Sequence, residues 1–235
     1  GKLNLEIHLI AAPNRSKRQD IRTTAISDSN HKSLINLIGK KHSKIFYQSR
    51  EIDLYKEYSG EVKHFMNLSK KDENLMFLFQ NETLKKIIQK KINKYKNLKT
   101  YYKKVSKVDV ENNGVLFANK KINYDAIFVC TGSKSEIVKD IFGDRFIENK
   151  TNEVAFTSIV NHTSNINNAK QFFLKEGPMA ILPLNKNKFS FVWSVSSKLK
   201  NQNPAPFVTK KLKEILKLKN DLKISKIDCF PISFK

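Results

Sequence analysis

The stretch INYDAIFVCTGSKSEIVKDIFG, residues Ile122–Gly143, decides the fold expected for this chain. Its apolar run Ala126–Cys130 is predicted to be a strand buried on both faces, as in a parallel sheet covered by helices. A tight turn at Thr131-Gly132 follows, and a helix is expected to begin at Ser133 or Ser135. Such a corner leaves backbone N–H groups free to bind an anion, for example the phosphates of a dinucleotide. An ordinary α/β crossover with a serine cap fits the same pattern, so both interpretations stay open at this point.

The length and composition indicate a folded protein. The chain has 235 residues, of which 40% are hydrophobic and 10% aromatic, and this excludes a disordered chain. Its length allows one large domain or two small ones.

The net charge of +22 at pH 7 is the unusual feature of the composition. It suggests a nucleic acid or an anionic membrane as partner, and therefore an alternative function as a basic, non-catalytic binding module. The lysines are spread over nearly every segment, however, and a nucleic-acid surface requires them to cluster. Nucleic acid is therefore the less favoured partner, and an anionic membrane surface remains open because it needs less specific geometry.

Cysteine and histidine give no sign of a metal site or a disulfide framework. Cys130 and Cys229 lie in apolar runs without a CxxC pattern, so both are expected to be buried packing residues. The five histidines are isolated from one another. No apolar run is long enough to span a membrane, and the first residues do not resemble a signal peptide. The predicted location is the cytoplasm, with peripheral contact on the inner face of the membrane as an option.

The first part of the chain alternates predicted strands and helices. A helix is expected over Ser27–Ile38, because apolar residues recur at helical spacing and Gly39 ends the pattern. A second helix is expected to be capped by Asn81. The sequence Asn112-Asn113-Gly114 is the strongest short hairpin signal. Strands are expected over Leu3–Ile10, Lys44–Leu54, Glu61–Leu68, Leu75–Phe79, Tyr101–Val110 and Val115–Ala118.

The second part is predicted to be an antiparallel sheet with one helix, Phe207–Leu218. Along Phe189–Val195, apolar side chains alternate with smaller ones, which is typical of a sheet covered on one face. The other strands are expected over Val154–Val160, Ala169–Leu174, Pro178–Leu182 and Leu222–Asp228. The predicted fold class is α/β, with an α/β part over residues 1–150 that includes strands at about 44–79, and an antiparallel β part over 151–230.

Five segments, in order, resemble the flavin-dependent aromatic-ring hydroxylases of ubiquinone biosynthesis, the UbiH/UbiF/VisC type related to p-hydroxybenzoate hydroxylase. Asp20–Ser27 (DIRTTAIS) resembles the family segment D-x-R-x-x-A-L-S, and Asn81–Leu84 resembles its N/R-x-x-L helix start. Tyr124–Ser135 (YDAIFVCTGSKS) resembles YDLLVGADGxxS. Gly177–Pro183 (GPMAILP), followed by VWS, resembles the pair G-P-L-A-L-L-P and S-x-V-W. Phe230–Ile232 resembles F-P-L.

The resemblance implies a p-hydroxybenzoate hydroxylase-like fold, that is, an incomplete Rossmann-like FAD/NAD(P)-binding domain joined to an antiparallel β-sheet substrate domain. Residues 231–235 would begin the return to the FAD domain. It also implies that NAD(P)H reduces FAD and that the flavin activates O2 to hydroxylate a prenylated phenol. Peripheral membrane contact and ubiquinone-pathway proteins are the implied partners.

The resemblance assigns roles to particular residues. Arg22 would lie near the flavin or its phosphates and Asn81 beside the ribose. Thr131, Gly132 and Ser135 would lie at the pyrophosphate. Met179, Ile181 and Trp193 would line or support the substrate wall, although all three also fit an ordinary core and Asn81 a simple helix cap. No catalytic or metal-binding residue is assigned.

The sequence also departs from the family. The family begins with a strand–GxGxxG–helix unit that holds the FAD phosphates, and it has a later G-D-A-A-H segment; neither is in this sequence. Ala11-Ala12 stands where an acidic residue is expected to bind the ribose. Thr131 stands where the family has an aspartate, and a hydroxyl can donate to a phosphate oxygen without adding negative charge. The sequence is therefore expected to be either part of a longer enzyme or a divergent relative without tight FAD binding.

Overall fold

The computed structural model describes residues 5–13, 20–132, 135–143, 149–201, 203–218 and 222–234. The chain forms two compact units, and each unit is built from separated segments. Unit 1 comprises residues 1–18, 90–150 and 233–235, and unit 2 comprises residues 19–89 and 151–232. The predicted helix start at Ser133 lies outside the described residues.

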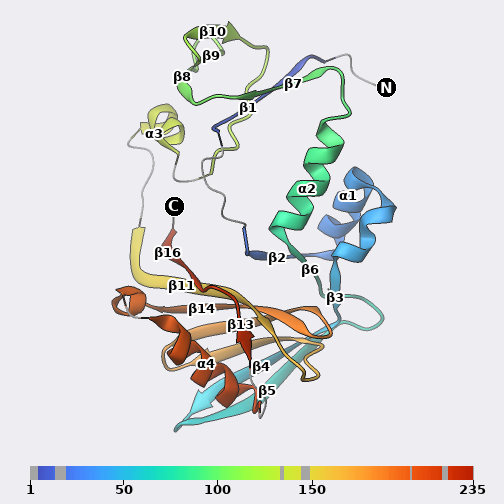
Figure 1. Cartoon of the computed structure of the whole chain (residues 1–235), viewed down its shortest axis with the longest axis vertical. Coiled ribbons are helices and arrows are strands. Elements are labelled where there is room, and N and C mark those ends of the chain that lie inside the picture. The colour runs from blue at the N-terminus through green and yellow to red at the C-terminus, as the bar shows by residue number, and fades with distance from the viewer. Residues whose placement is uncertain are drawn as a thin grey trace. The chain divides into compact units, whose positions relative to one another are not determined.

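Unit 1 contains a short parallel pair of strands and a small antiparallel sheet (Figure 1). Strands β1 (Ile7–Ala11) and β7 (Leu98–Tyr102) run parallel, with Ile7 opposite Leu98. The antiparallel sheet has the order β10-β9-β8 and is followed by the short helix α3. Their bounds are β8 (Val105–Asp109), β9 (Gly114–Phe117), β10 (Lys120–Asn123) and α3 (Glu136–Phe142).

The predicted strand Ala126–Cys130 is wrong for this structure. The segment has no strand partner among the described residues, and Phe128 is 88% exposed. A strand requires a neighbour to satisfy its backbone N–H and C=O groups, and apolar side chains alone do not supply one. Cys130 is consequently exposed, which also corrects its predicted role as a buried packing residue.

Unit 2 contains a three-stranded sheet with helices against it. The sheet has the antiparallel order β2-β6-β3, formed by β2 (Thr23–Ile26), β6 (Met76–Gln80) and β3 (Tyr47–Ser49). Ser27 caps α1 (Asp28–Ile38), and Gly39, at φ 99°, ends it, as predicted. Buried apolar residues of α1 and β6 share a core with apolar side chains of α2 (Asn81–Ile92). The predicted single strand Lys44–Leu54 is wrong, because this region divides into the 3-10 helix η1 (Lys40–Ile45), β3 and β4.

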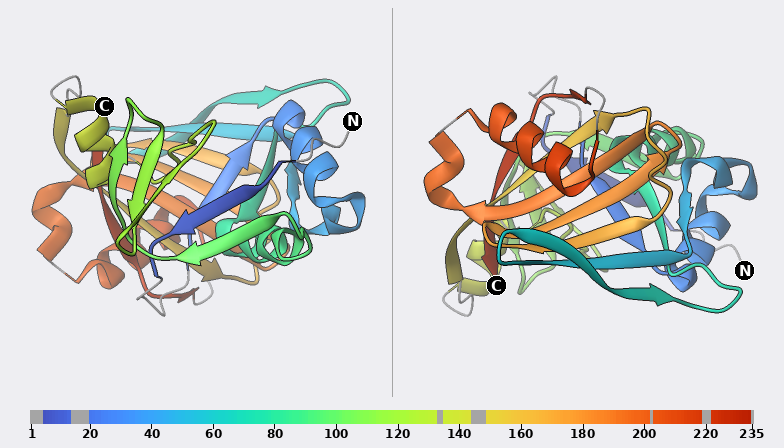
Figure 2. Two further views of the ribbon diagram at one scale, coloured as in Figure 1. Left: turned by 90° about the horizontal axis from the view of Figure 1, so that it is seen from above. Right: turned by 90° about the horizontal axis from the view of Figure 1, so that it is seen from below.

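The large sheet of unit 2 has eight strands, in the order β15-β11-β14-β13-β12-β4-β5, with β16 also paired to β11. Figure 2 shows helix α4 against this sheet and β5 at its edge. β4 and β12 pair in parallel although they are more than a hundred residues apart, whereas the other central pairs are antiparallel. The bounds are β4 (Glu51–Tyr58), β5 (Glu61–Ser69), β11 (Asn149–Asn161), β12 (Ala169–Leu174), β13 (Gly177–Asn185), β14 (Lys188–Ser196), η3 (Ser197–Asn201), α4 (Pro204–Ile215), β15 (Lys223–Ile224) and β16 (Asp228–Phe234).

The main core of unit 2 lies between this sheet and α4. Phe189, Phe191, Trp193 and Val195 are all at most 1% exposed, as their alternation predicted. Their partners across β11 and β13 project from the same face, because side chains opposite each other in register share a face. The predicted strand Leu222–Asp228 is only partly correct, since pairing covers β15 and resumes in β16 at Asp228.

Candidate functional site

Arg22 lies at the centre of a polar cluster in unit 2. Its Nε and Nη2 donate to the two oxygens of Asp20 at 2.8 and 2.7 Å, and its backbone N–H donates to the same carboxylate at 3.0 Å. This bidentate geometry is the strong form of a charge-assisted hydrogen bond. The hydrogen bond lowers the pKa of Asp20 and raises the pKa of Arg22, so both remain charged over the neutral range.

The structure brings Asn81 to the same cluster. The Asn81 backbone N–H donates to the carbonyl of Arg22 at 3.1 Å, and its side-chain Oδ1 accepts from Thr24 Oγ1 at 2.6 Å. Its side chain also hydrogen-bonds to Asp20, which contributes to the low pKa of that carboxyl. Asn81 is the first residue of α2, so its side chain connects β2 to the helix start.

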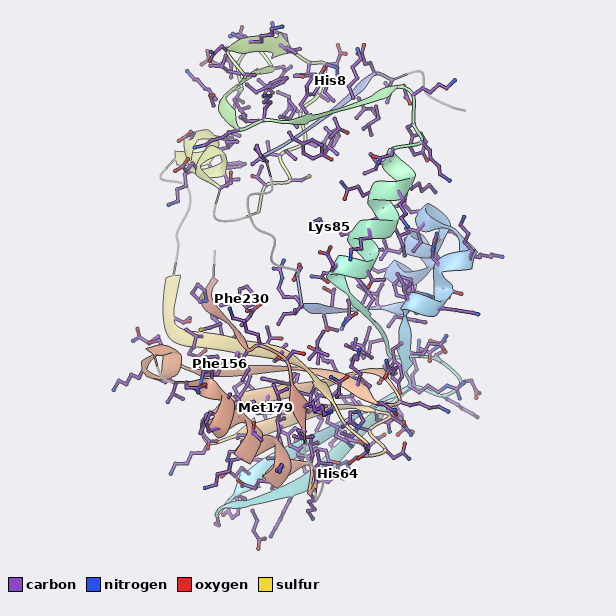
Figure 3. The ribbon with its side chains drawn as sticks, viewed as in Figure 1. His8, His64, Lys85, Phe156, Met179 and Phe230 are labelled. Carbon is purple, nitrogen blue, oxygen red and sulfur yellow. The ribbon has the colours of Figure 1, made fainter. Side chains whose placement is uncertain are left out.

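Phe230 completes the cluster from a third part of the chain. The Arg22 guanidinium lies over the Phe230 ring, with Cζ 5.7 Å from its centroid, which is within the range of a cation–π contact. Figure 3 shows Phe230 on β16. Three of the five segments that resemble the hydroxylase family therefore meet at one place in unit 2. The sequence did not single out Thr24 or Phe230, and the only signal for Phe230 was its place in the F-P-I segment.

The second group of predicted cofactor residues lies in unit 1. Gly132 has φ 77° with nothing within 4 Å of the position of a Cβ, so the bend is open on that side. Ser135 precedes α3 at the N-cap position, and its hydroxyl makes no capping hydrogen bond. The Ser135 backbone N–H instead donates to the Gly132 carbonyl at 3.3 Å. Thr131 is exposed.

The bend borders an open pocket of about 470 Å³. Most of the lining side chains are aliphatic or aromatic. The lining residues are Ile127, Val129, Gly132, Val138, Ile141 and Phe142. A lining of this kind is more suitable for a flat apolar group than for a pyrophosphate, which requires cations or several N–H donors. The assignment of this bend to the pyrophosphate therefore stays a prediction.

The three predicted substrate residues lie in the core of unit 2. Met179, Ile181 and Trp193 are each 0% exposed, and Met179 is opposite Trp193 in register. The Trp193 ring stacks on Phe207 of α4 with centroids 4.7 Å apart, and its Nε1 donates to the Gly177 carbonyl at 3.2 Å. Figure 3 labels Met179 on the large sheet. In this conformation these side chains can support a binding surface, but they cannot contact a bound molecule directly.

The face of β11 and β14 that points away from α4 carries two buried hydroxyls that the sequence did not indicate. Thr157 and Ser190 are 4% and 0% exposed, and neither Oγ has a hydrogen-bond partner among the described residues. Val192 is opposite Thr157, and Ile159 is opposite Ser190, so all four share this face. Unsatisfied buried hydroxyls are costly, and they are common where a ligand or water supplies the missing partner.

Each unit by itself offers donor groups for a bound cofactor. Unit 2 offers a fixed guanidinium and an amide beside an aromatic ring, and unit 1 offers an open bend with two hydroxyls beside an apolar pocket. These donors are compatible with a flavin dinucleotide. In the described part of the chain, no group of three or more histidines, cysteines and carboxylates could hold a metal ion, and no helix is long and apolar enough to cross a membrane.

Comparison with known structures defines the class of fold: the chain has the fold of FAD-binding aromatic hydroxylases, with TM-scores of 0.65–0.73. p-Nitrophenol 4-monooxygenase PnpA from Pseudomonas putida matches 98% of this chain at TM-score 0.70 and 12% identity. Pseudomonas aeruginosa PqsL in complex with 2-aminobenzoylacetate matches 89% at TM-score 0.73 and 9% identity. The oxygenase of 2-methyl-3-hydroxypyridine-5-carboxylic acid matches 97% at TM-score 0.68 and 11% identity.

The match covers only part of these proteins. The chain spans 62% of PnpA, 60% of PqsL and 63% of the pyridine-carboxylate oxygenase. No protein-family model and no curated protein matches the sequence. The likeness therefore establishes the fold, and it leaves activity and substrate to be proposed.

Proposed function

We propose that this chain forms the larger part of an FAD-dependent monooxygenase that hydroxylates an electron-rich aromatic ring with NAD(P)H and O2. The convergence of Arg22, Asn81 and Phe230 is the observation that carries the proposal. These residues come from three separated segments. The segments of Arg22 and Asn81 resemble parts of the hydroxylase family near the cofactor, and the segment of Phe230 resembles the F-P-L segment that precedes its second FAD motif. Two of the solved structures with this fold are monooxygenases by name or description, and CmlS is a flavin-dependent halogenase, which supports flavin chemistry on an aromatic ring.

The residues of this chain would bind and orient the cofactor. When bound, FAD supplies hydride acceptance from NAD(P)H and the activation of O2. Arg22 would present its free N–H groups to an electron-rich atom of the cofactor, and Asp20 would hold the guanidinium in place. Asn81 would fix the start of α2 beside the same cofactor. Thr131 and Ser135 would donate hydroxyl hydrogen bonds from the bend.

The substrate is proposed to be a prenylated phenol of ubiquinone biosynthesis. The support is the sequence resemblance of GPMAILP and VWS to the sheet segments of the UbiH/UbiF/VisC-type hydroxylases. In our proposal, the aromatic ring lies on the sheet face opposite α4, because Met179 and Trp193 occupy the face that α4 covers. Thr157 and Ser190 lie on that face but are buried, so they would support the binding surface rather than contact the ring directly.

The test is flavin binding by this chain and by the full product of its gene. FAD is titrated while flavin fluorescence and absorbance are recorded, with Arg22→Met as the test variant and Lys85→Met, an exposed residue of α2, as the matched control. Loss of a charged hydrogen bond is expected to weaken FAD binding about tenfold or more in Arg22→Met, with no change in the control. A full gene product that neither carries nor acquires flavin would refute the proposal.

The proposed substrate is tested in a separate experiment. Prenylated phenols are offered to the flavin-loaded protein, and NAD(P)H oxidation is compared with the yield of hydroxylated product. Product from a small, water-soluble phenol alone would retain the hydroxylase proposal and reject the ubiquinone pathway.

A further inference from the structure

An uncovered apolar surface lies on unit 2 at the edge of the large sheet. It consists of Tyr58, Phe65, Met66, Leu68 and Phe173, which are between 42% and 69% exposed. We call this surface the edge patch. Scattered exposed apolar residues are normal, but a contiguous group of large ones marks an interaction surface.

Register and a β-bulge place these residues on one face. Phe173 is opposite Lys56, Leu54 is opposite Met66, and Ile52 is opposite Leu68, so these side chains all project to the side away from α4. The pairing of β4 with β5 shifts at Leu54 and Tyr55, which leaves Phe65 as an extra residue beside Met66. The Phe65 and Phe173 rings are 6.1 Å apart, so the bulge directs Phe65 to the same face.

The charges of β4 are divided between the two faces. The carboxylates of Asp53 and Glu57 project to the α4 side, where Lys170 and Lys211 pair with them at 2.9 and 3.8 Å. Lys56 lies on the face of β4 that carries the edge patch, and it is exposed.

The opposing strand β5 adds a second cation to the patch. Lys63 is opposite Lys56, and it pairs with Glu61 at 3.1 Å. The acidic side chains of β4 are thus turned away. The edge patch combines aromatic side chains with Lys56, Lys63 and one carboxylate, Glu61, which is opposite Tyr58 and pairs with Lys63.

We propose that the edge patch docks the protein on an anionic lipid bilayer. Aromatic and aliphatic side chains enter the headgroup region, and nearby lysines are attracted by the negative surface potential. A second copy of the chain is the less favourable occupant, because each copy carries a net charge of +22 and Lys56 and Lys63 would be brought toward like charges. This proposal does not depend on flavin binding, although a membrane-docked sheet would suit a prenylated substrate.

The first experiment measures sedimentation of the full chain with vesicles of phosphatidylcholine alone or mixed with phosphatidylglycerol. We expect binding to the mixed vesicles and little to the neutral ones. Phe65→Ser combined with Met66→Ser is expected to reduce the partition coefficient at least about tenfold, since each buried apolar group contributes to partition. The control is Val110→Ser, in which a residue of unit 1 with 58% exposure is changed in the same way.

Charge is tested with a pair of matched variants. Lys56→Gln with Lys63→Gln is expected to weaken binding about fivefold per lysine removed. Lys85→Gln with Lys86→Gln removes the same charge from α2, where both residues are exposed, and is expected to have a much smaller effect. Equal loss in both pairs would mean diffuse attraction by the whole surface and would overturn the proposal.

A fluorescent reporter distinguishes insertion from mere contact. Trp193 is the single tryptophan of the chain and is 0% exposed, so its emission gives a constant background. Phe65→Trp is expected to show blue-shifted emission with anionic vesicles, and Val110→Trp none. The unchanged emission of Trp193 also reports that each variant is folded. Absence of the shift in Phe65→Trp, or a concentration-dependent dimer abolished by the same patch variants, would overturn the proposal.

Discussion

Lys211 is a nearly buried cation that ties α4 to the large sheet, and its removal gives a stability change that can be worked out from the structure. Its Nζ lies 2.9 Å from Glu176, 3.8 Å from Glu57 and 3.9 Å from Glu214. Its side chain is 10% exposed, and those of Glu57 and Glu176 are 14% and 28% exposed. Burial alone would lower the pKa of Lys211, but the carboxylates outweigh it and the pKa is raised.

The change Lys211→Met keeps the length of the side chain and leaves the carboxylates without their cation. Removing one partner of a fully buried pair costs about 3–5 kcal/mol. Water still reaches Glu176, so we expect a loss of about 2–3 kcal/mol in the free energy of unfolding at pH 7. Because the folded pKa of Lys211 is raised, its contribution is complete below pH 10.5 and is lost as the pH rises through the raised value.

The assay is urea unfolding followed by the fluorescence of Trp193, which stacks on Phe207 of α4. The transition midpoint should fall while the slope m stays the same. Lys210→Met, an exposed neighbour on α4, is the control and should change stability by less than about 0.5 kcal/mol. In a double-mutant cycle, Lys211→Met and Glu176→Gln should show a coupling energy above about 1 kcal/mol. A loss below about 0.5 kcal/mol in Lys211→Met, or additivity in the cycle, would refute the reasoning.

Three further predictions concern single residues. Gly177 has φ 130°, and a Cβ there would lie 2.1 Å from a backbone oxygen of β14, so Gly177→Ala should destabilise unit 2 by about 3 kcal/mol or more in thermal unfolding; an unchanged melting temperature would contradict this close approach. The pKa of Asp20 is lowered by Arg22, so its contribution to stability is present above pH 3.8 and is lost as the pH falls below it. Asp20→Asn should therefore flatten the fall in stability below pH 3.8, and an unchanged pH profile would count against the ion pair. Cys130 is exposed, so an aromatic disulfide reagent should modify one thiol rapidly without denaturant, and Cys130→Ser should abolish that phase; a wild-type protein with no rapid phase would show that the thiol is covered.

Features fixed by short-range interactions could be predicted from the sequence. Helix α1 has its cap at Ser27 and its stop at Gly39 because both act on neighbouring backbone groups. The hairpin between β8 and β9 follows from Asn112-Asn113-Gly114, and Asn113 has the positive φ of 47° that such a turn requires. The alternation in β14 also appears as predicted, because one face of that strand packs against α4.

Features that depend on distant segments could not be predicted from local pattern. The parallel pairing of β4 with β12 joins residues more than a hundred positions apart, and neither strand contains a signal for its partner. The segment Ala126–Cys130 has the composition of a buried strand, but pairing requires a neighbouring edge that composition cannot specify. The cluster of Arg22, Asn81 and Phe230 could not be expected from local pattern, because it is formed by contacts between the residue before β2, the start of α2 and β16.

The parallel pair of β1 and β7 in unit 1 has unpaired edges among the described residues. Among the described strands, β1 pairs with β7 alone, and Ile7 and Leu9 are 44% and 40% exposed. His8 hydrogen-bonds to Tyr124 at 2.8 Å, so Tyr124 lies beside β1. One face of this pair is covered, since His8 contacts Tyr124 and Tyr101 contacts Phe117, and the face with Ile7 and Leu9 is open. A two-stranded parallel pair of this kind is a weak element by itself, because parallel sheets are stable when they are wide and covered. We therefore expect the β1–β7 pair to be stabilised less by its own strand pairing than the eight-stranded sheet of unit 2 is.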